Sequence, residues 1–209
     1  MDNKQEHLQA LTDIRSMMER SFRFISLSGL SGVFAGVFAL IGVYLAHLKI
    51  ENLYANFYNR VDSDLIFDSM VYLITVAVSV LFCSLLVGVV LTVRNSKKRG
   101  ISIWDGTSKR LLINLAIPLG TGGLFCLLLL YHGIGWLIGP VTLIFYGLAL
   151  INASKYTFND IRYLGIMEIL LGLFSTYFIG YGLICWAIGF GVLHIIYGAV
   201  MFFKYERRS

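Results

Sequence analysis

The chain has 209 residues, of which 57% are hydrophobic and 14% are charged, whereas a soluble domain has roughly 25% charged residues. The charged residues gather in a few polar stretches separated by long, almost uncharged ones, which excludes an ordinary soluble protein. The net charge of +5 is explained by basic residues that flank membrane helices, so we expect membrane lipid as a partner and no nucleic acid.

The N-terminal segment, residues 1–23, is too polar to be a secretory signal peptide. Its apolar residues recur at the three- and four-residue spacing of an amphipathic helix: Leu8, Leu11, Ile14, Met17 and Met18. We expect this helix to lie on the inner membrane surface. The alternative is that residues 1–22 dock a cytoplasmic partner or a second subunit.

Six apolar runs follow, and each is close to the ~20 residues that a helix needs to cross a bilayer. They cover about 24–48, 65–93, 111–130, 134–153, 163–179 and 183–203. We therefore predict an all-α membrane protein with six transmembrane helices arranged as three hairpins. Its parts are an amphipathic segment (1–23), a transmembrane domain (24–203) and a short basic cytoplasmic tail (204–209).

Basic residues are divided unequally between the two sides of these helices. Of the 17 lysines and arginines, all but Lys49 and Arg60 lie on the side of the two termini. Because basic residues accumulate in cytoplasmic loops, both termini are predicted to be cytoplasmic.

A glycine signature recurs in the first, third and fifth predicted helices. It reads Gly-Val-Phe at 36–38, Gly-Leu-Phe at 123–125 and Gly-Leu-Phe at 172–174, each with a small residue seven positions earlier. Seven residues are two turns, so each pair lies on one face, where small residues let helices approach closely. Helices four and six share a Trp, Tyr-Gly and Lys-Tyr pattern. We predict an internal repeat of three parallel hairpins, with chance similarity as the alternative.

Five glycines are the candidates for close helix packing: Gly29, Gly32, Gly36, Gly165 and Gly172. In the first helix, Ser28, Gly32 and Gly36 form a ladder with four-residue spacing. This ladder is our candidate for a homodimer contact.

Three glycine-rich hairpins in a chain of this size resemble the HdeD-like acid-resistance membrane proteins, a family of small six-helix bacterial proteins. The resemblance rests on the glycine-rich helix faces and the hairpin layout over most of the spanning region. It implies a stress protein of the bacterial inner membrane, and it transfers no functional residues. The N-terminal helix and the basic loop at 94–110 fall outside the pattern.

Two ionisable residues lie inside predicted spans, where they are costly and are by default functional candidates. Glu168 lies six residues after Arg162, and His194 lies ten residues before Lys204. At 1.5 Å per residue these separations are about 9 and 15 Å from the same side, so a contact in the cytoplasmic half of the bundle is feasible. The pair is either a proton or ligand site or a structural hydrogen bond between helices.

Asn114 belongs to a second polar feature. Pro118 removes the helical hydrogen bond to the Asn114 carbonyl, so a kink could open a small polar cavity, unless the helix repairs itself locally. We count Asn114 and Tyr197 with Glu168 and His194 as the candidate ligand or proton site.

No catalytic, metal or haem constellation is evident in the sequence. His47 and His132 lie near outer helix ends, away from His194, and the three cysteines lie inside apolar runs. We therefore expect no cofactor and a non-enzymatic protein, stress-related or regulatory, that acts through lipid, a small ligand or a partner. The alternatives are a small proton-coupled transporter or channel that uses Glu168 and His194, and a membrane enzyme acting on a lipid or quinone.

Overall fold

A computed structural model describes Gln9, Leu11, Trp104 and residues 28–57, 63–99 and 106–206. The predicted amphipathic helix at 1–23 therefore lies almost wholly outside the described residues, as does the end of the basic tail from 207. Within the described ranges every regular element is a helix and no strand occurs, so the predicted all-α class is confirmed.

Within the described ranges, five α-helices precede the last membrane helix: α2 (Gly29–Phe57), α3 (Ser63–Arg99), α4 (Gly106–Tyr131), α5 (Ile138–Ala153) and α6 (Asp160–Tyr177). One continuous helix completes the chain. It consists of α7 (Gly182–Trp186), a π-helical segment (Ala187–Leu193), α8 (His194–Met201) and a second π-helical segment (Phe202–Glu206). We refer to residues 182–206 together as the last helix. A short 3-10 turn (Gly135–Leu137) precedes α5.

In the described part of the chain, five helices are long and apolar enough to cross a membrane: Gly29–Ala55, Leu65–Lys98, Gly106–Tyr131, Gly135–Ala153 and Gly182–Glu206. The remaining helix, α6, has 18 residues but contains Asp160, Arg162 and Glu168. The prediction of several membrane-length apolar helices is confirmed, and the sixth span depends on α6.

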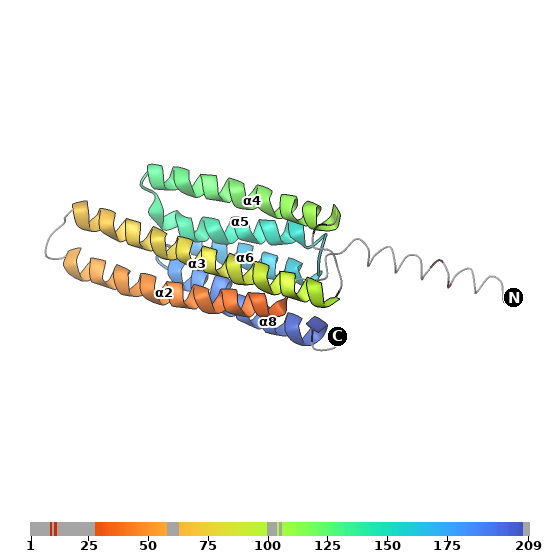
Figure 1. The fold of residues 1–209 in the computed structure, drawn as a ribbon. Coiled ribbons are helices and arrows are strands. Elements are labelled where there is room, and N and C mark those ends of the chain that lie inside the picture. The colour runs from red at the N-terminus through yellow and green to blue at the C-terminus, as the bar shows by residue number, and fades with distance from the viewer. Residues whose placement is uncertain are drawn as a thin grey trace.

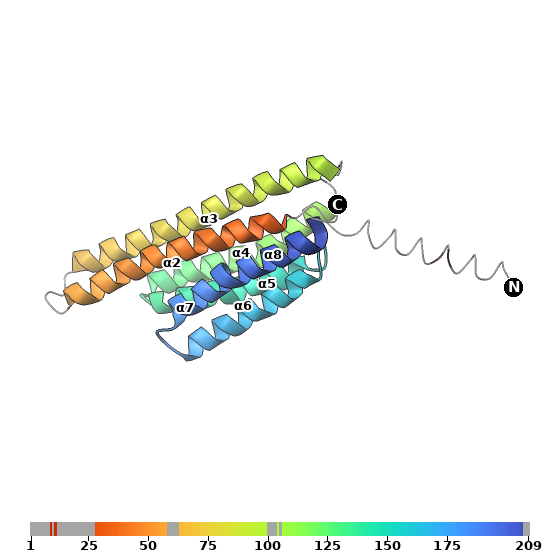
Figure 2. The same ribbon diagram turned by 90° about the horizontal axis from the view of Figure 1, so that it is seen from below.

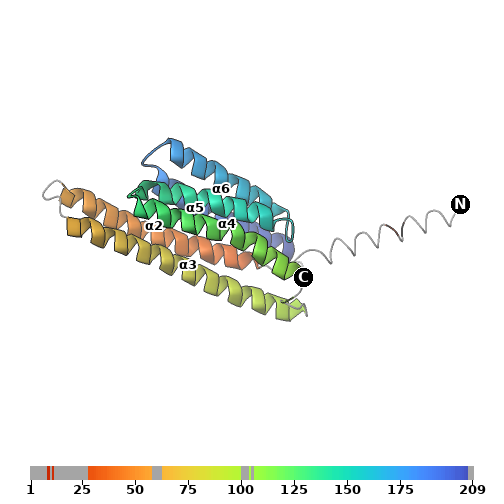
Figure 3. The ribbon, with the colours of Figure 1, turned by 90° about the horizontal axis from the view of Figure 1, so that it is seen from above.

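Successive helices run back and forth along one bundle (Figure 1). The pairs α2–α3, α4–α5 and α5–α6 pack extensively, whereas the last helix packs mainly against α2. Figure 2 shows the last helix crossing the bundle beside α2, with α6 on its other side. The predicted third hairpin therefore differs from the first two, because its second helix returns to the start of the chain. Figure 3 shows α3 at the outer edge, next to α2.

Glycines bring the backbones of α2 and the last helix into direct contact. A Cβ on Gly198 would lie 2.6 Å from the Gly29 carbonyl oxygen, and a Cβ on Gly36 would lie 2.6 Å from the Gly191 carbonyl oxygen. A Cβ on Gly32 would likewise lie 3.2 Å from the Gly198 Cα. The face that the sequence assigns to a homodimer contact is thus occupied by a helix of the same chain, and a second copy would have to dock elsewhere.

A second backbone contact joins α5 and α6. A Cβ on Gly165 would lie 2.7 Å from the Gly147 carbonyl oxygen, and one on Gly172 would lie 2.9 Å from the Pro140 carbonyl oxygen. The copy of the glycine signature in α4 behaves differently, because a Cβ on Gly123 would meet nothing within 4 Å, whereas one on its neighbour Gly122 would meet Phe145. The signature therefore marks close packing in α2 and α6 but not in α4.

We expect Gly198→Ala to lower the thermal stability of the protein in lipid nanodiscs, because the added methyl group would push two backbones apart. Overpacking of this kind costs about 1–3 kcal/mol. Gly88→Ala in α3 is the matched control, because a Cβ there meets nothing within 4 Å and alanine favours helix more than glycine does. Equal melting temperatures for the two variants would contradict the packing described here.

Candidate functional site

Side chains from three helices meet at mid-depth in the bundle: Tyr146 of α5, Glu168 of α6 and His194 of the last helix. Glu168 lies eight residues after the start of α6 and nine before its end. His194 lies twelve residues from each end of the last helix. The pair therefore lies about halfway along both helices.

Glu168 and His194 are in contact, as their predicted depths allowed. Oε1 of Glu168 lies 3.4 Å from Nδ1 of His194, and the two side chains are 0% and 8% exposed. Neither carboxyl oxygen of Glu168 has a hydrogen-bond partner among the described residues. Buried polar groups are nearly always hydrogen-bonded, so this carboxyl group is an exception that needs a functional explanation.

Tyr146 and Gly189 fix the orientation of the His194 ring. The Tyr146 hydroxyl lies 2.8 Å from Nε2, and Nδ1 lies 2.9 Å from the Gly189 carbonyl oxygen. A carbonyl oxygen can only accept, so Nδ1 donates to it, and in the neutral ring Nε2 then accepts from Tyr146. Both ring nitrogens are therefore engaged, and the carboxyl group of Glu168 lies beside the Nδ1 proton.

The backbone before His194 is shaped to admit the carboxyl group. A π-helical segment covers Ala187–Leu193, and such segments are frequent at functional sites. Within it, a Cβ on Gly189 would collide with the Glu168 carboxyl oxygen and would lie 2.7 Å from a Leu143 methyl group. Glycine at position 189 thus allows Glu168 to approach the last helix.

Aromatic rings cover the histidine. The centroid of Phe190 lies 5.9 Å from that of His194 in a stacked arrangement, and Phe190 also contacts Tyr146 at 4.9 Å and Trp186 at 4.7 Å. These rings surround the pair with apolar surface. In such surroundings a lone charge is costly, whereas a pair with no net charge is tolerated.

One proton can be shared by the pair without creating net charge. A carboxylic acid beside a neutral imidazole and a carboxylate beside an imidazolium contain the same number of protons and are both neutral overall. Removing that proton or adding a second one leaves a net charge in a buried apolar site. The arrangement is therefore suited to holding and exchanging a single proton.

The structure does not bring all four predicted site residues together. Asn114 donates from its side chain to the Arg110 carbonyl oxygen at 2.9 Å in its own helix, and α4 packs mainly on α5, so Asn114 lies apart. Tyr197 lies one turn beyond His194, and its buried hydroxyl has no hydrogen-bond partner among the described residues. Tyr146 was missed as a site residue, although the Tyr-Gly pair shared by helices four and six marks both tyrosines.

A polar cluster lies at the C-terminal end of the last helix, around Asp160 of α6. Lys204 Nζ and the Tyr205 hydroxyl both donate to Asp160 Oδ2, at 2.8 and 2.9 Å. Asp160 precedes the apolar part of α6. Partial burial raises the pKa of its carboxyl group, but the hydrogen bonds from Lys204 and Tyr205 outweigh burial, so that pKa lies below its ordinary value. Glu206 accepts from the Ser28 hydroxyl at 3.2 Å and from the Gly29 N–H.

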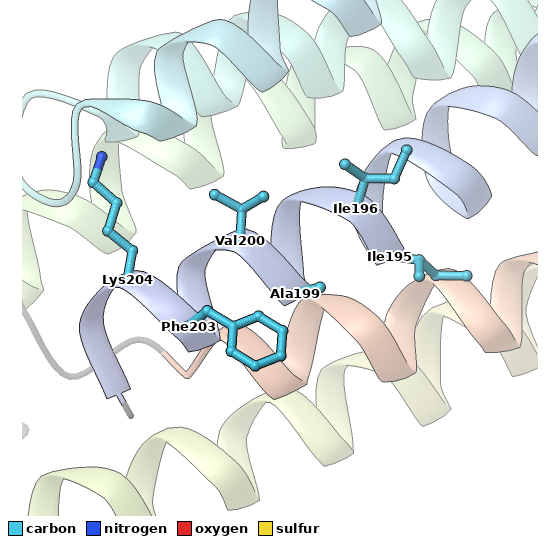
Figure 4. A pocket seen from close by; sticks show the side chains of 6 residues that line it. All are labelled: Ile195, Ile196, Ala199, Val200, Phe203 and Lys204. Carbon is cyan, nitrogen blue, oxygen red and sulfur yellow. The ribbon is translucent and has the colours of Figure 1, made fainter. Parts of the chain in front are cut away.

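The two best-formed hollows lie on outer surfaces. One follows the last helix and is lined by residues of that helix (Figure 4): Ile195, Ile196, Ala199, Val200, Phe203 and Lys204. The other follows the far end of α3: Val89, Val90, Val93, Arg94, Lys97 and Lys98. Neither hollow is lined by Tyr146, Glu168 or His194. The described residues also contain no group of three or more His, Cys, Asp or Glu side chains that could hold a metal ion.

Comparisons of the chain with protein-family models, with curated proteins and with solved structures find no match.

We expect Tyr146→Phe to destabilise the protein by about 1 kcal/mol, the order measured for hydrogen bonds between membrane helices. The change leaves Nε2 of His194 buried without its donor while keeping the ring of residue 146. Tyr177→Phe is the control, because Tyr177 is 81% exposed. Unfolding in mixed micelles measures both variants, and equal stabilities would show that the 2.8 Å contact contributes nothing.

Proposed function

We propose that this protein is a non-enzymatic, multi-pass membrane protein that binds a proton at the Glu168–His194 pair and changes its helix packing in response. The single observation that supports this proposal is the Glu168 carboxyl group. It is fully buried, unpartnered by hydrogen bonds among the described residues and 3.4 Å from an imidazole nitrogen. A purely structural carboxyl group would be expected to have its oxygens satisfied.

The proposal includes six spans, with α6 as the sixth. The basic residues of the described chain support this reading, because most of them lie where α3, α5 and the last helix end and α4 and α6 begin: Arg94, Lys97, Lys98, Lys109, Arg110, Lys155, Arg162 and Lys204. These helix ends lie at one end of the bundle (Figure 1). By the positive-inside rule that end faces the cytoplasm, and lipid contacts the exposed apolar side chains.

The regulatory or stress-related role rests on two sequence features. One is the resemblance to the HdeD-like proteins, which also implies a bacterial inner membrane. The other is the amphipathic segment at 1–22, which we propose passes the state of the bundle to a cytoplasmic partner or a second subunit. The contacts of Ser28 and Gly29 with Glu206 attach the start of α2, which follows this segment in the sequence, to the last helix.

We expect the fluorescence of Trp186 to change on acidification in the wild-type protein and to stay constant in Glu168→Gln. The Trp186 ring contacts Phe190, which stacks on His194, so a proton at the pair alters the surroundings of Trp186. The measurement uses nanodiscs and a background in which Trp104 and Trp136 are replaced by phenylalanine. Glu51→Gln, with an exposed carboxyl group in α2, is the matched control. A titration that is identical in Glu168→Gln would refute the proton site.

A small proton-coupled transporter is the second candidate. It is favoured by the position of the pair at mid-depth between three helices, because coupling-ion sites of transporters lie near the bilayer midplane. Proteoliposomes containing a pH-sensitive dye measure it: we expect proton flux in the wild-type protein and none in Glu168→Gln. If the wild-type vesicles show no flux while the fluorescence titration is present, the regulatory form of the proposal holds and the transporter form fails.

A further inference from the structure

One face of the last helix carries three polar residues, with Met201 among them, between the buried pair and the end of the bundle. His194, Tyr197, Met201 and Tyr205 are spaced by three, four and four residues, so they share one helix face. This row of residues begins at His194, which is bonded to Tyr146, and ends at Tyr205, which is bonded to Asp160. Eleven residues at 1.5 Å each make this distance about 16 Å.

Tyr197 lies in the middle of that row. Its ring packs with those of Tyr146 and Tyr205 against one apolar cluster, whose buried members are Leu150, Phe158, Ile161, Leu164 and Met201. Its hydroxyl oxygen is buried and has no hydrogen-bond partner among the described residues. A polar atom is thus held inside an apolar cluster, between two hydrogen-bonded ends.

We propose that the Tyr197 hydroxyl holds internal water and relays protons between Asp160 at the polar end and the Glu168–His194 pair. The inference rests on the proposed proton-binding function and adds the route by which the proton arrives. A tyrosine hydroxyl can both donate and accept hydrogen bonds. Internal waters bond to about three buried polar groups that lack other partners, and the Tyr197 hydroxyl is such a group. Here the candidate groups are the hydroxyls of Tyr197, Tyr146 and Tyr205.

The transfer protonates Glu168 and leaves the tyrosine hydroxyls on the route uncharged. A water next to Tyr197 donates a proton to its hydroxyl oxygen while the hydroxyl releases its own proton to a second water on the Tyr146 side. The proton then passes to Nε2 of His194 through the Tyr146 hydroxyl, and the Nδ1 proton moves to the carboxylate of Glu168, which leaves the ring protonated at Nε2. Release of the proton by the reverse steps returns the proton to Nδ1, and rotation of the tyrosine hydroxyls resets their donor directions. No bond other than O–H and N–H bonds forms or breaks, and no electron is transferred.

The charged and titratable groups around the route come from three elements. The α5 helix supplies Tyr146, α6 supplies Asp160 and Glu168, and the last helix supplies His194, Tyr205 and Lys204. The packed part of α2 presents glycines to the last helix, apart from its first turn, where Glu206 bonds to Gly29. Lys204 keeps Asp160 ionised at neutral pH, so this carboxylate can accept a proton from solvent and pass it inward.

The test follows the protonation of Glu168 after rapid acidification of the full chain in phosphatidylethanolamine and phosphatidylglycerol vesicles. Time-resolved infrared spectroscopy records the C=O stretch of the carboxylic acid, which is assigned by its loss in Glu168→Gln. We expect Tyr197→Phe to reach the same amplitude as the wild type at a rate at least about tenfold lower, which corresponds to ~1.4 kcal/mol in the barrier. Tyr163→Phe is the control, because Tyr163 is 69% exposed and lies off the route.

Three outcomes overturn the inference or its premise. If the wild type gives no Glu168 signal, the proposed proton-binding function fails, whatever Tyr197 does. If the wild type gives the signal and Tyr197→Phe matches its rate, the relay fails while the proton site stands. If Tyr163→Phe slows the rate equally, the effect is not specific to the route.

A second variant and a second measurement keep the relay testable if Tyr197→Phe fails to fold. Tyr205→Phe, at the polar end of the route, is expected to slow protonation in the same way. The melting temperature of Tyr197→Phe gives independent evidence. Removing a dry, unpartnered hydroxyl should stabilise the protein, whereas removing one that binds water should not. A clear rise in melting temperature would therefore overturn the proposed hydration of Tyr197.

Discussion

A carboxyl group with no exposed surface, at the middle of an apolar bundle, can persist only if its charge is neutralised or shared. Glu168 meets this requirement through His194, and the surrounding sequence is arranged so that the two can touch. Gly189 leaves space for the carboxyl group, the π-helical segment ends immediately before the histidine, and Tyr146 holds the far side of the ring. These features are explained by the need to place the Glu168 carboxyl group beside the His194 ring.

The helix packing sets the position of the pair. Backbone contacts at Gly29, Gly36 and Gly198 hold the last helix against α2, and those at Gly165 and Gly172 hold α6 against α5. The last helix thereby lies with α2 on one side and the α5–α6 pair on the other, which brings His194 within reach of Tyr146 and Glu168 together. Close contacts between glycine backbones couple the geometry of the site to the packing of these helices.

Much of this arrangement follows from the sequence, and the remainder depends on helix neighbours. The apolar runs predict the helices, and counting residues from Arg162 and Lys204 places Glu168 and His194 at similar depths. The sequence does not reveal that the last helix returns to α2, because helices that are apolar all round give no sign of which face packs. Tyr146 was missed for that reason, and Asn114 was included although α4 lies away from the pair.

The most direct test of the central claim is the protonation state of the His194 ring in lipid. Solid-state ¹⁵N NMR of histidine-labelled protein, assigned with His194→Gln, reports it. The account predicts a ring with its proton on Nδ1 and a hydrogen-bonded Nε2 at neutral pH, and a change in the Nδ1 signal on acidification that disappears in Glu168→Gln. A ring with its proton on Nε2, or one that responds to pH identically without the carboxyl group, would contradict a proton shared between Glu168 and His194.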